Sequence, residues 1–352
     1  MALVDSSPNH PNKGPGLIIG FSFLAAFTTV IFGARIWSRR LTRQYYELDD
    51  HLCLASLVIQ HGVFATAVVM VAEGGLGKDM SDAMAGDPNV LVVLPKTLFI
   101  LKLIYAYSSP LVKLSVLALY WRIFPTAYIK LGCKIIGGLN VAWCVGVTVF
   151  SLTQCRPLKA FWDVELRALP TTKCIDSCVG LLVNAIANCI IDLLTLVLPL
   201  YEIAKLRVST KRRFTIGGVF LLGGIAFAAS LVRSVFGGIL TSKGISANLS
   251  LDLVPPIAAD VVEVYVSIIG ACMPTLVPVY RQLRYGSPLK SHHTSASSQE
   301  PLPTALPASA ASGSRKQTPS ERDSVGSNEH LISERKRYPV AYTEVEKSEW
   351  KV

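Results

Sequence analysis

Apolar residues gather along this chain in long runs, separated by segments rich in charge or in Gly, Pro and Asn. A helix rises about 1.5 Å per residue, so about 20 apolar residues cross the roughly 30 Å hydrocarbon layer of a bilayer. The runs reach that length, and they lack the short alternating segments of a membrane barrel. Seven membrane-spanning helices are therefore predicted, at residues 17–37, 52–72, 92–121, 131–152, 178–200, 215–240 and 254–279.

The composition agrees with an all-α, polytopic membrane protein, because 51% of the 352 residues are hydrophobic and only 16% are charged. Residues 1–16 form a short extracellular N-terminus and residues 17–284 the seven-helix bundle in this prediction. Residues 285–352 are rich in Ser, Pro, Ala and Thr and poor in large apolar side chains. Such a segment cannot bury enough apolar surface to fold, so a disordered C-terminal tail is expected.

The distribution of basic residues predicts which side of the membrane each loop faces. With the N-terminus outside and the C-terminus cytosolic, fourteen Lys and Arg near the helix ends fall on the cytosolic side and seven on the opposite side. The cytosolic set includes Arg122, Lys211, Arg212 and Arg213, which are candidates for contact with a cytosolic signalling partner. The net charge of +10 is explained mostly by this bias, so lipid headgroups are the expected counter-charge and no nucleic acid is expected.

Two features of the predicted outer loops agree with this orientation. Asn248 begins an Asn-Leu-Ser sequon between the last two helices, which makes it a candidate glycosylation site. Cys155 and Cys174 both lie between the fourth and fifth helices, where an oxidising compartment permits a disulfide, with Cys178 as the alternative partner.

Several segments, taken together and in order, resemble the fungal rhodopsin-like domain family. They are "ELDDHLCLAS", "GGLGKD", "LVKLSVLALYWRIFP", "CRPLKAFWD" with "KCID", "NAIANCIIDLLTLVLPLYEIAKLRVSTKRR", "ASLVRSVF" and "DVVEVYVSIIGACMPTLVPV". The resemblance covers about residues 17–284 and implies a seven-helix integral membrane protein. The family includes orphan receptors related to fungal pathogenicity and membrane proteins encoded in toxin gene clusters.

The residues argue against pigment chemistry. A retinal Schiff base needs a lysine in the seventh helix and a proton pump needs carboxylates in the third. The predicted seventh helix holds no lysine and the third holds no Asp or Glu, leaving Lys102 or Lys113 as displaced alternatives. No zinc spacing, phosphate loop or catalytic triad was found, so no cofactor, metal site or enzymatic activity is expected.

Lys113 is the residue that most needs an explanation, because a lysine inside a bilayer costs at least about 2.5–3.5 kcal/mol. Asp192 lies at a similar predicted depth, and Asn184, Asn188 and Asp192 recur every four residues on one helix face. The hypothesis is that Lys113 faces the interior and pairs with Asp192 within this polar network. The alternative is that its long stem carries the ammonium to the cytosolic headgroups.

A second group of charges is predicted nearer the outside, comprising Lys102, Arg233, Asp260 and Glu263. These residues could line a pocket for a polar ligand, or they could form a structural layer of ion pairs without a ligand.

Three functions are compatible with this sequence. The leading one is a receptor-like protein of the plasma membrane that senses a small molecule or surface cue. The alternatives are a transporter or accessory protein of a secondary-metabolite (toxin) pathway, and a scaffold whose charges are purely structural.

Overall fold

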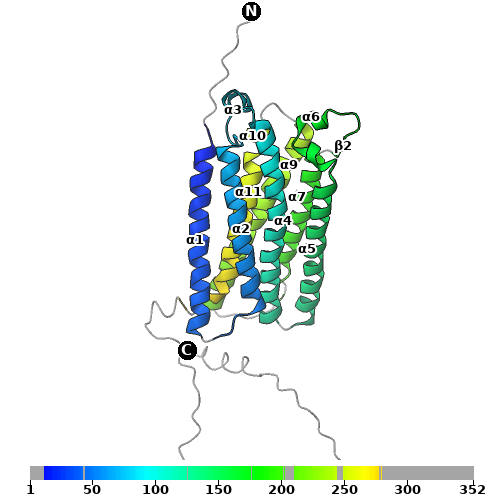
Figure 1. The fold of residues 1–352 in the computed structure, drawn as a ribbon. Helices are drawn as coiled ribbons and strands as arrows, with labels where there is room; N and C mark the ends of the chain where they lie inside the picture. Colours follow the sequence, from blue (N-terminus) through cyan, green and yellow to red (C-terminus); the bar gives the residue numbers. More distant parts are fainter. Residues whose placement is uncertain are drawn as a thin grey trace, which may run out of the picture. The chain divides into compact units, whose positions relative to one another are not determined.

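A computed structural model describes residues 12–42, 44–124, 126–175, 177–200, 202, 210–243, 249–276 and 279. Within these ranges seven helices are long and apolar enough to cross a membrane, which confirms the predicted fold class. They are α1 (Gly14–Leu41), α2 (Leu48–Ala72), α4 (Val90–Ile123), α5 (Ala127–Thr153), α7 (Ser177–Val197), α9 (Thr210–Lys243) and α11 (Val254–Cys272). The helices lie side by side as one bundle (Figure 1).

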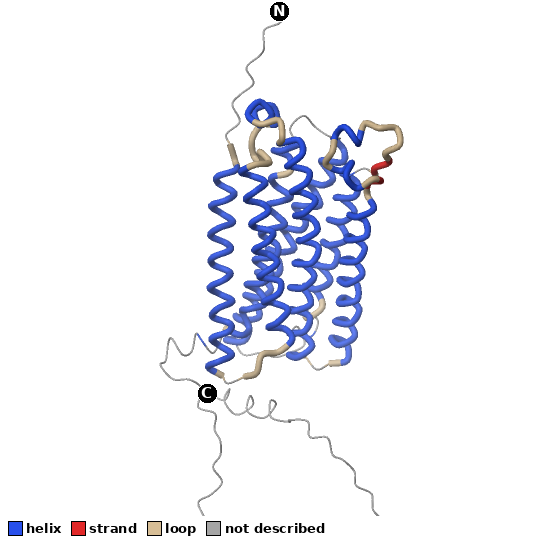
Figure 2. The backbone as a smooth tube through the Cα atoms, in the orientation of Figure 1, coloured by secondary structure: helices blue, strands red, loops and turns tan. Residues whose placement is uncertain are grey.

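The short elements cluster at the end of the bundle where α1 begins. They are α3 (Met80–Gly86), β1 (Cys155–Arg156), η1 (Leu158–Phe161), α6 (Val164–Arg167), β2 (Lys173–Cys174) and α10 (Leu249–Asp252), while η2 (Met273–Thr275) follows α11. Figure 2 shows the two strands as a small patch between otherwise helical elements. Hydropathy did not indicate these elements, because none is long enough to leave a periodic pattern.

The predicted bridge between Cys155 and Cys174 is present and joins β1 to β2. It closes the loop whose η1 helix packs against α4, where the ring centroid of Phe99 lies 5.8 Å from that of Phe161 and 5.9 Å from that of Trp162. The bridged loop therefore covers the adjacent end of α4.

A second clasp at the same end ties the start of α1 to the loop after α2 and to α10. Gly77 has a φ of 89°, a conformation that favours glycine, and its carbonyl accepts a hydrogen bond from the Lys13 backbone N–H at 3.0 Å. Ser250 of α10 donates to the Gly75 carbonyl at 2.7 Å and accepts from the Gly77 N–H at 3.2 Å.

The seventh described membrane span, α11, forms the centre of the bundle. α11 packs against α1, α2, α4 and α9, and its side chains Val261, Val264, Tyr265 and Ile268 are fully buried. The outer helices instead expose apolar side chains such as Phe23 and Val58, as expected for surfaces in contact with lipid.

Small residues allow α2 and α4 to approach closely. Ser56 Oγ donates to the Ser108 carbonyl at 3.0 Å, and Ser108 Oγ contacts Gln60 Oε1 at 2.9 Å. Pro110 follows within α4 and removes one backbone donor from the helix. The serine pair therefore supplies interhelical hydrogen bonds at the depth where the helical ladder is interrupted.

Candidate functional site

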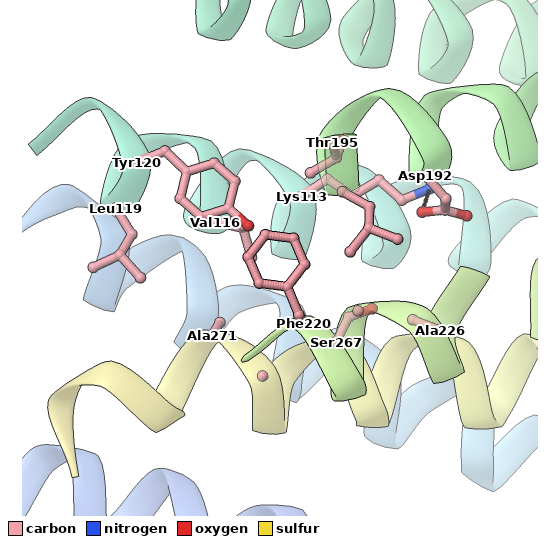
Figure 3. Close-up of a pocket in the computed structure, with 13 residues that line it drawn as sticks. Lys113, Val116, Leu119, Tyr120, Asp192, Thr195, Phe220, Ala226, Ser267 and Ala271 are labelled. Atoms are coloured by element: carbon pink, nitrogen blue, oxygen red, sulfur yellow. Dashed lines mark ion pairs between the residues drawn. The ribbon is translucent and has the colours of Figure 1, made fainter. Parts of the chain in front are cut away.

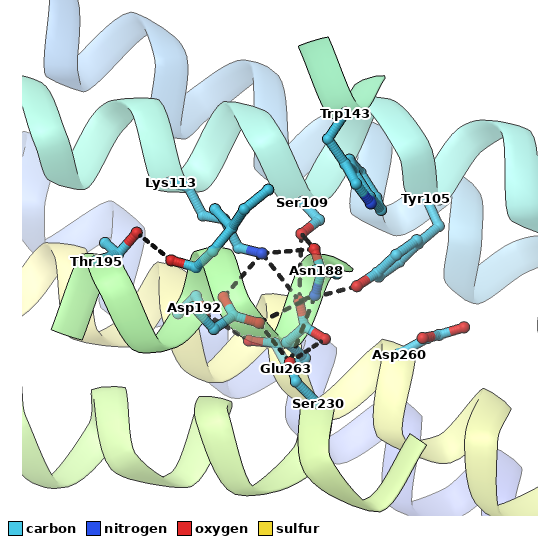
Figure 4. A network of polar contacts seen from close by, with 12 residues as sticks. Tyr105, Ser109, Lys113, Trp143, Asn188, Asp192, Thr195, Ser230, Asp260 and Glu263 are labelled. Carbon is cyan, nitrogen blue, oxygen red and sulfur yellow. Dashed lines mark hydrogen bonds and ion pairs between the residues drawn. The ribbon is translucent and has the colours of Figure 1, made fainter. Parts of the chain in front are cut away.

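Lys113 extends from α4 into a polar network between α4, α7, α9 and α11 (Figure 4). Its Nζ lies 2.6 Å from Asn188 Oδ1 and 2.8 Å from Asp192 Oδ1, with Glu263 Oε1 farther away at 3.6 Å. Lys113 is only 4% exposed. The structure thus brings Lys113 and Asp192 together inside the bundle, and Asn188 joins both of them.

Glu263 of α11 is the most highly connected carboxylate of the network. Its Oε1 accepts hydrogen bonds from Tyr105 at 2.8 Å, from Ser109 at 3.2 Å and from Asn188 Nδ2 at 3.0 Å. Its Oε2 accepts from Ser230 Oγ of α9 at 2.7 Å. One carboxylate therefore connects all four helices.

Ser230 also bridges to α7. Its Oγ contacts Asp192 Oδ2 at hydrogen-bond distance, and Asn188 Nδ2 lies 3.0 Å from the same carboxylate oxygen. Asn188 and Asp192 stand four residues apart on α7 and so share one helix face, as the sequence indicated.

Arg233 extends the network along α9. Its Nη1 lies 2.6 Å from Asp260 Oδ1 and 3.8 Å from Glu263 Oε2, and its guanidinium carbon is 4.9 Å from the centroid of the Tyr105 ring. Its Nε and Nη2 have no hydrogen-bond partner among the described residues, although Arg233 is only 7% exposed. One edge of the guanidinium is therefore paired and the other is not.

The charged side chains of this site are two cations and three carboxylates, listed as Lys113, Arg233, Asp192, Asp260 and Glu263. Burial of such groups costs several kcal/mol per ion unless partners compensate. Truncation of one partner of a buried pair costs about 3–5 kcal/mol, because a charge is left without a counter-ion. These five side chains are thus far more strongly constrained than charges at a protein surface.

The two groups that the sequence placed at separate depths meet at Glu263. The predicted depths were obtained by counting residues from the end of each helix, which assumes that all helices begin at the same depth in the membrane. The helices differ in length, since α4 has 34 residues and α11 has 19. The expected outer layer and the expected Lys113 network consequently form one connected site.

Two predicted members lie outside these contacts. The Asn184 side-chain oxygen has no hydrogen-bond partner among the described residues, while its backbone carbonyl accepts from Trp143 Nε1 at 3.4 Å. Lys102 lies under the bridged loop, with Nζ 5.6 Å from the centroid of the Phe161 ring. Neither residue shares an ion pair with the network in the described part of the chain.

A cavity of about 70 Å³ adjoins the network on the side where α4, α7 and α11 end. Lys113 and Asp192 lie at its edge, and Tyr120 and Phe220 line it with other, mostly apolar, residues (Figure 3). Since one water occupies about 30 Å³ of liquid volume, the space suits about two water molecules. The described cavity thus lies on the opposite side of Lys113 from the bridged loop.

A second buried ion cluster, which was not predicted from the sequence, joins α1 to α2. Arg35 Nη2 lies 2.5 Å from Asp49 Oδ2, its Nε lies 2.7 Å from Asp50 Oδ1, and its Nη1 donates to the Ala271 carbonyl at 2.6 Å. Arg39 contacts the same two carboxylates at 3.1 and 3.0 Å. The sequence does contain a signal for this cluster. The two arginines are four residues apart and so share one helix face, and two adjacent carboxylates lie in the first turn of the next helix.

The remaining predicted residues lie at the helix ends or outside the described residues. Arg122 forms an ion pair with Glu47 at 2.8 Å, with both side chains at least one-third exposed. Lys211, Arg212 and Arg213 fall in the first turns of α9, but their side chains are not described. Asn248 lies outside the described residues, and no metal-binding group of three or more His, Cys, Asp or Glu occurs among those that are described.

The described residues form seven apolar helices, and a network of buried charged side chains lies between α4, α7, α9 and α11. These features define a polytopic helical membrane protein with an intramembrane ionic network. The sequence matches the Fungal rhodopsin domain over residues 34–282, which is more than half of the chain. The protein therefore belongs to the fungal rhodopsin domain family, and the resemblance noted from its motifs is confirmed.

Three relatives of the chain carry different functional names. The chain is 28% identical to "Polyenoic acids biosynthesis gene cluster protein Ba17b" of Metarhizium anisopliae, over 81% of this chain and 79% of that protein. It is 23% identical to "Fugralins biosynthesis cluster protein 2" of Gibberella zeae, over 79% and 68% respectively. It is 24% identical to "Receptor GIN3" of Arthrobotrys oligospora, over 64% and 53%. No solved structure matches the chain significantly.

Proposed function

We propose that this protein is a receptor-like membrane protein that senses a small molecule or surface cue and transmits it through α4, α7, α9 and α11. The observation that carries the proposal is the connection of these four helices through Glu263 and Asn188. Displacement of any one helix breaks contacts between buried charges, so intermediate positions are costly. A packed polar core of this kind favours discrete arrangements that a ligand can select between.

The proposed orientation places the N-terminus outside and the C-terminus in the cytosol of a plasma-membrane protein. The Cys155–Cys174 disulfide supports it, because this bridge lies at the end where α1 begins and disulfides persist in oxidising compartments (Figure 1). Arg122 and residues 211–213 then face the cytosol, where a signalling partner would bind.

The proposed ligand site lies between the bridged loop and the ionic network. The unpaired guanidinium edge of Arg233 supplies donors there, and the unpaired Asn184 oxygen supplies an acceptor. Tyr105 and Trp143 connect these two residues, since Arg233 packs over the Tyr105 ring and the two aromatic rings have centroids 6.3 Å apart. This combination favours a ligand with both a polar group and a flat apolar part.

A second candidate function is supported by the names of the relatives. Two of them are described as proteins of biosynthesis clusters, so this chain could serve as a transporter or accessory protein for a secondary metabolite. In that case the protein would carry the ligand across the membrane instead of signalling that the ligand is bound. The network between α4, α7, α9 and α11 would then have to open toward the cavity near Tyr120.

One experiment separates the two functions. A fungal strain that lacks the gene is transformed with the wild-type gene, with the Arg233→Met variant or with an empty vector. Each strain is then exposed to fractions of its own culture medium. Cytosolic calcium and cyclic AMP are recorded together with accumulation of each fraction in the cells. A wild-type-dependent signal without accumulation supports the receptor, whereas accumulation without a signal contradicts it and supports transport.

A further inference from the structure

The hydrogen bonds around Ser230 contain one proton too few if all carboxylates are ionised. A serine hydroxyl donates a single hydrogen. Ser230 Oγ nevertheless lies at hydrogen-bond distance from two carboxylate oxygens, Asp192 Oδ2 and Glu263 Oε2. Without a further hydrogen, one of these contacts would bring two lone-pair-bearing oxygens together in a buried site.

Asn188 cannot supply that hydrogen. Its amide nitrogen has two hydrogens, and the two nearest acceptors are Asp192 Oδ2 and Glu263 Oε1, both at 3.0 Å. Ser230 Oγ is more distant from this nitrogen, at 3.5 Å. The side-chain donors are therefore already used on other oxygens.

The charges nearest Asp192 agree with this deficit. Lys113 and Arg233 supply two positive charges, and Asp192, Asp260 and Glu263 supply three negative charges when ionised. The other titratable groups nearby are Lys102 and Tyr105 on α4 and Cys189 on α7, and the carboxylate of this set that interacts with Lys102 is Asp260. The lysines of α5, which also packs against α7, lie against Trp121 instead. Among the described residues, Lys113 is thus the one cation that forms an ion pair with Asp192, and Glu263 shares it.

We propose that the network is a proton-binding site in which Asp192 Oδ2 carries the missing proton and donates it to Ser230 Oγ. Ser230 then donates to Glu263 Oε2, and every short contact contains one hydrogen. Glu263 stays ionised, because it receives Tyr105, Ser109 and Asn188 as donors and lies within 4 Å of both cations. Lys113 is then balanced by Glu263 and Arg233 by Asp260.

The cavity beside Asp192 provides the place from which this proton is exchanged. It lies against Lys113 and Asp192, and its volume of about 70 Å³ accommodates water. Loss of the proton leaves Asp192 and Glu263 both ionised beside Ser230, which can then donate to only one of them. The proton therefore stabilises the observed packing of these helices, independently of whether the protein is a receptor.

Infrared spectroscopy of the full-length protein in lipid nanodiscs tests this site. At neutral pH the wild type should show the carbonyl stretch of a buried, protonated carboxylic acid, shifted in D₂O. Asp192→Asn should lose this band, and Asp260→Asn, a matched buried carboxylate that contacts Arg233, should retain it. A wild type without the band, or a band that survives in Asp192→Asn, would overturn the proposal.

Thermal unfolding gives a second readout that does not depend on the band. The native state holds a proton that the solvated unfolded chain releases, so wild-type stability should fall as pH rises through neutrality. Asp192→Asn replaces the protonated acid by an amide of the same shape and should remove this component of the pH dependence. An unchanged pH dependence in Asp192→Asn would contradict the assignment.

Discussion

Replacement of Arg35 by Met tests whether the α1–α2 ion cluster holds the bundle together. Arg35 is fully buried and contacts two carboxylates and the Ala271 carbonyl at 2.5 to 2.7 Å. The variant leaves Asp49 and Asp50 with Arg39 as their only close cation in the described structure. We expect the free energy of unfolding to fall by about 3–5 kcal/mol, which is the cost of breaking a buried pair.

Arg122→Met provides the matched control. Arg122 also contacts a carboxylate at 2.8 Å, but its side chain is 33% exposed and that of Glu47 is 42% exposed. Such a pair is worth less than about 1 kcal/mol. Unfolding is followed in mixed micelles by titration with SDS, with loss of helical circular dichroism as the signal.

A charge-neutral double variant distinguishes lost pairing from lost packing. Arg35→Met with Asp50→Leu removes one charge of each sign, so we expect it to be more stable than Arg35→Met alone, with a coupling of about 1–3 kcal/mol. Equal losses for Arg35→Met and Arg122→Met, or additive losses in the double variant, would refute the reasoning.

Three further predictions concern other parts of the molecule. Lys113→Met should lower the unfolding free energy by about 3–5 kcal/mol in the same assay, and a loss under 1 kcal/mol would show that the ammonium is not buried. Cys155→Ser with Cys174→Ser should cost about 3 kcal/mol and abolish the effect of reducing agent on stability; a reductant effect that persists would contradict it. Gly77→Ala should cost about 1–3 kcal/mol, because its φ is 89° and the added methyl group would lie 2.8 Å from backbone, whereas Gly86→Ala, with open space around it, should be close to neutral.

The fold could be predicted because hydrophobic runs of bilayer length leave few alternatives for the backbone. Of the site, the sequence placed Lys113 and Asp192 at similar depth and Asn188 on the face of Asp192. It could not place Glu263 with them, because residue counting gives a depth but not the vertical offset between helices. It also could not indicate Ser230, since a serine in a membrane helix commonly bonds to its own helix.

The short elements at the end of the bundle were missed for a different reason. β1 and β2 have two residues each, and their pairing depends on contacts between residues 155 and 174 rather than on local propensity. The Arg35 cluster was missed because the acidic residues at the start of α2 also fit helix capping, and Glu47 and Asp50 do form a capping box there.

The central position of α11 has a consequence for how the protein is made. This helix follows the six other described membrane spans in the chain, and it carries Asp260 and Glu263, which pair with Arg233 and Lys113. Before α11 is inserted, Lys113 can pair with Asp192 of α7, but Arg233 lacks Asp260 and Glu263, its ion-pair partners in the described structure. α11 alone would bring two carboxylates that resist insertion. The buried charges of α9 and α11 are thus compensated only when the two helices pack together.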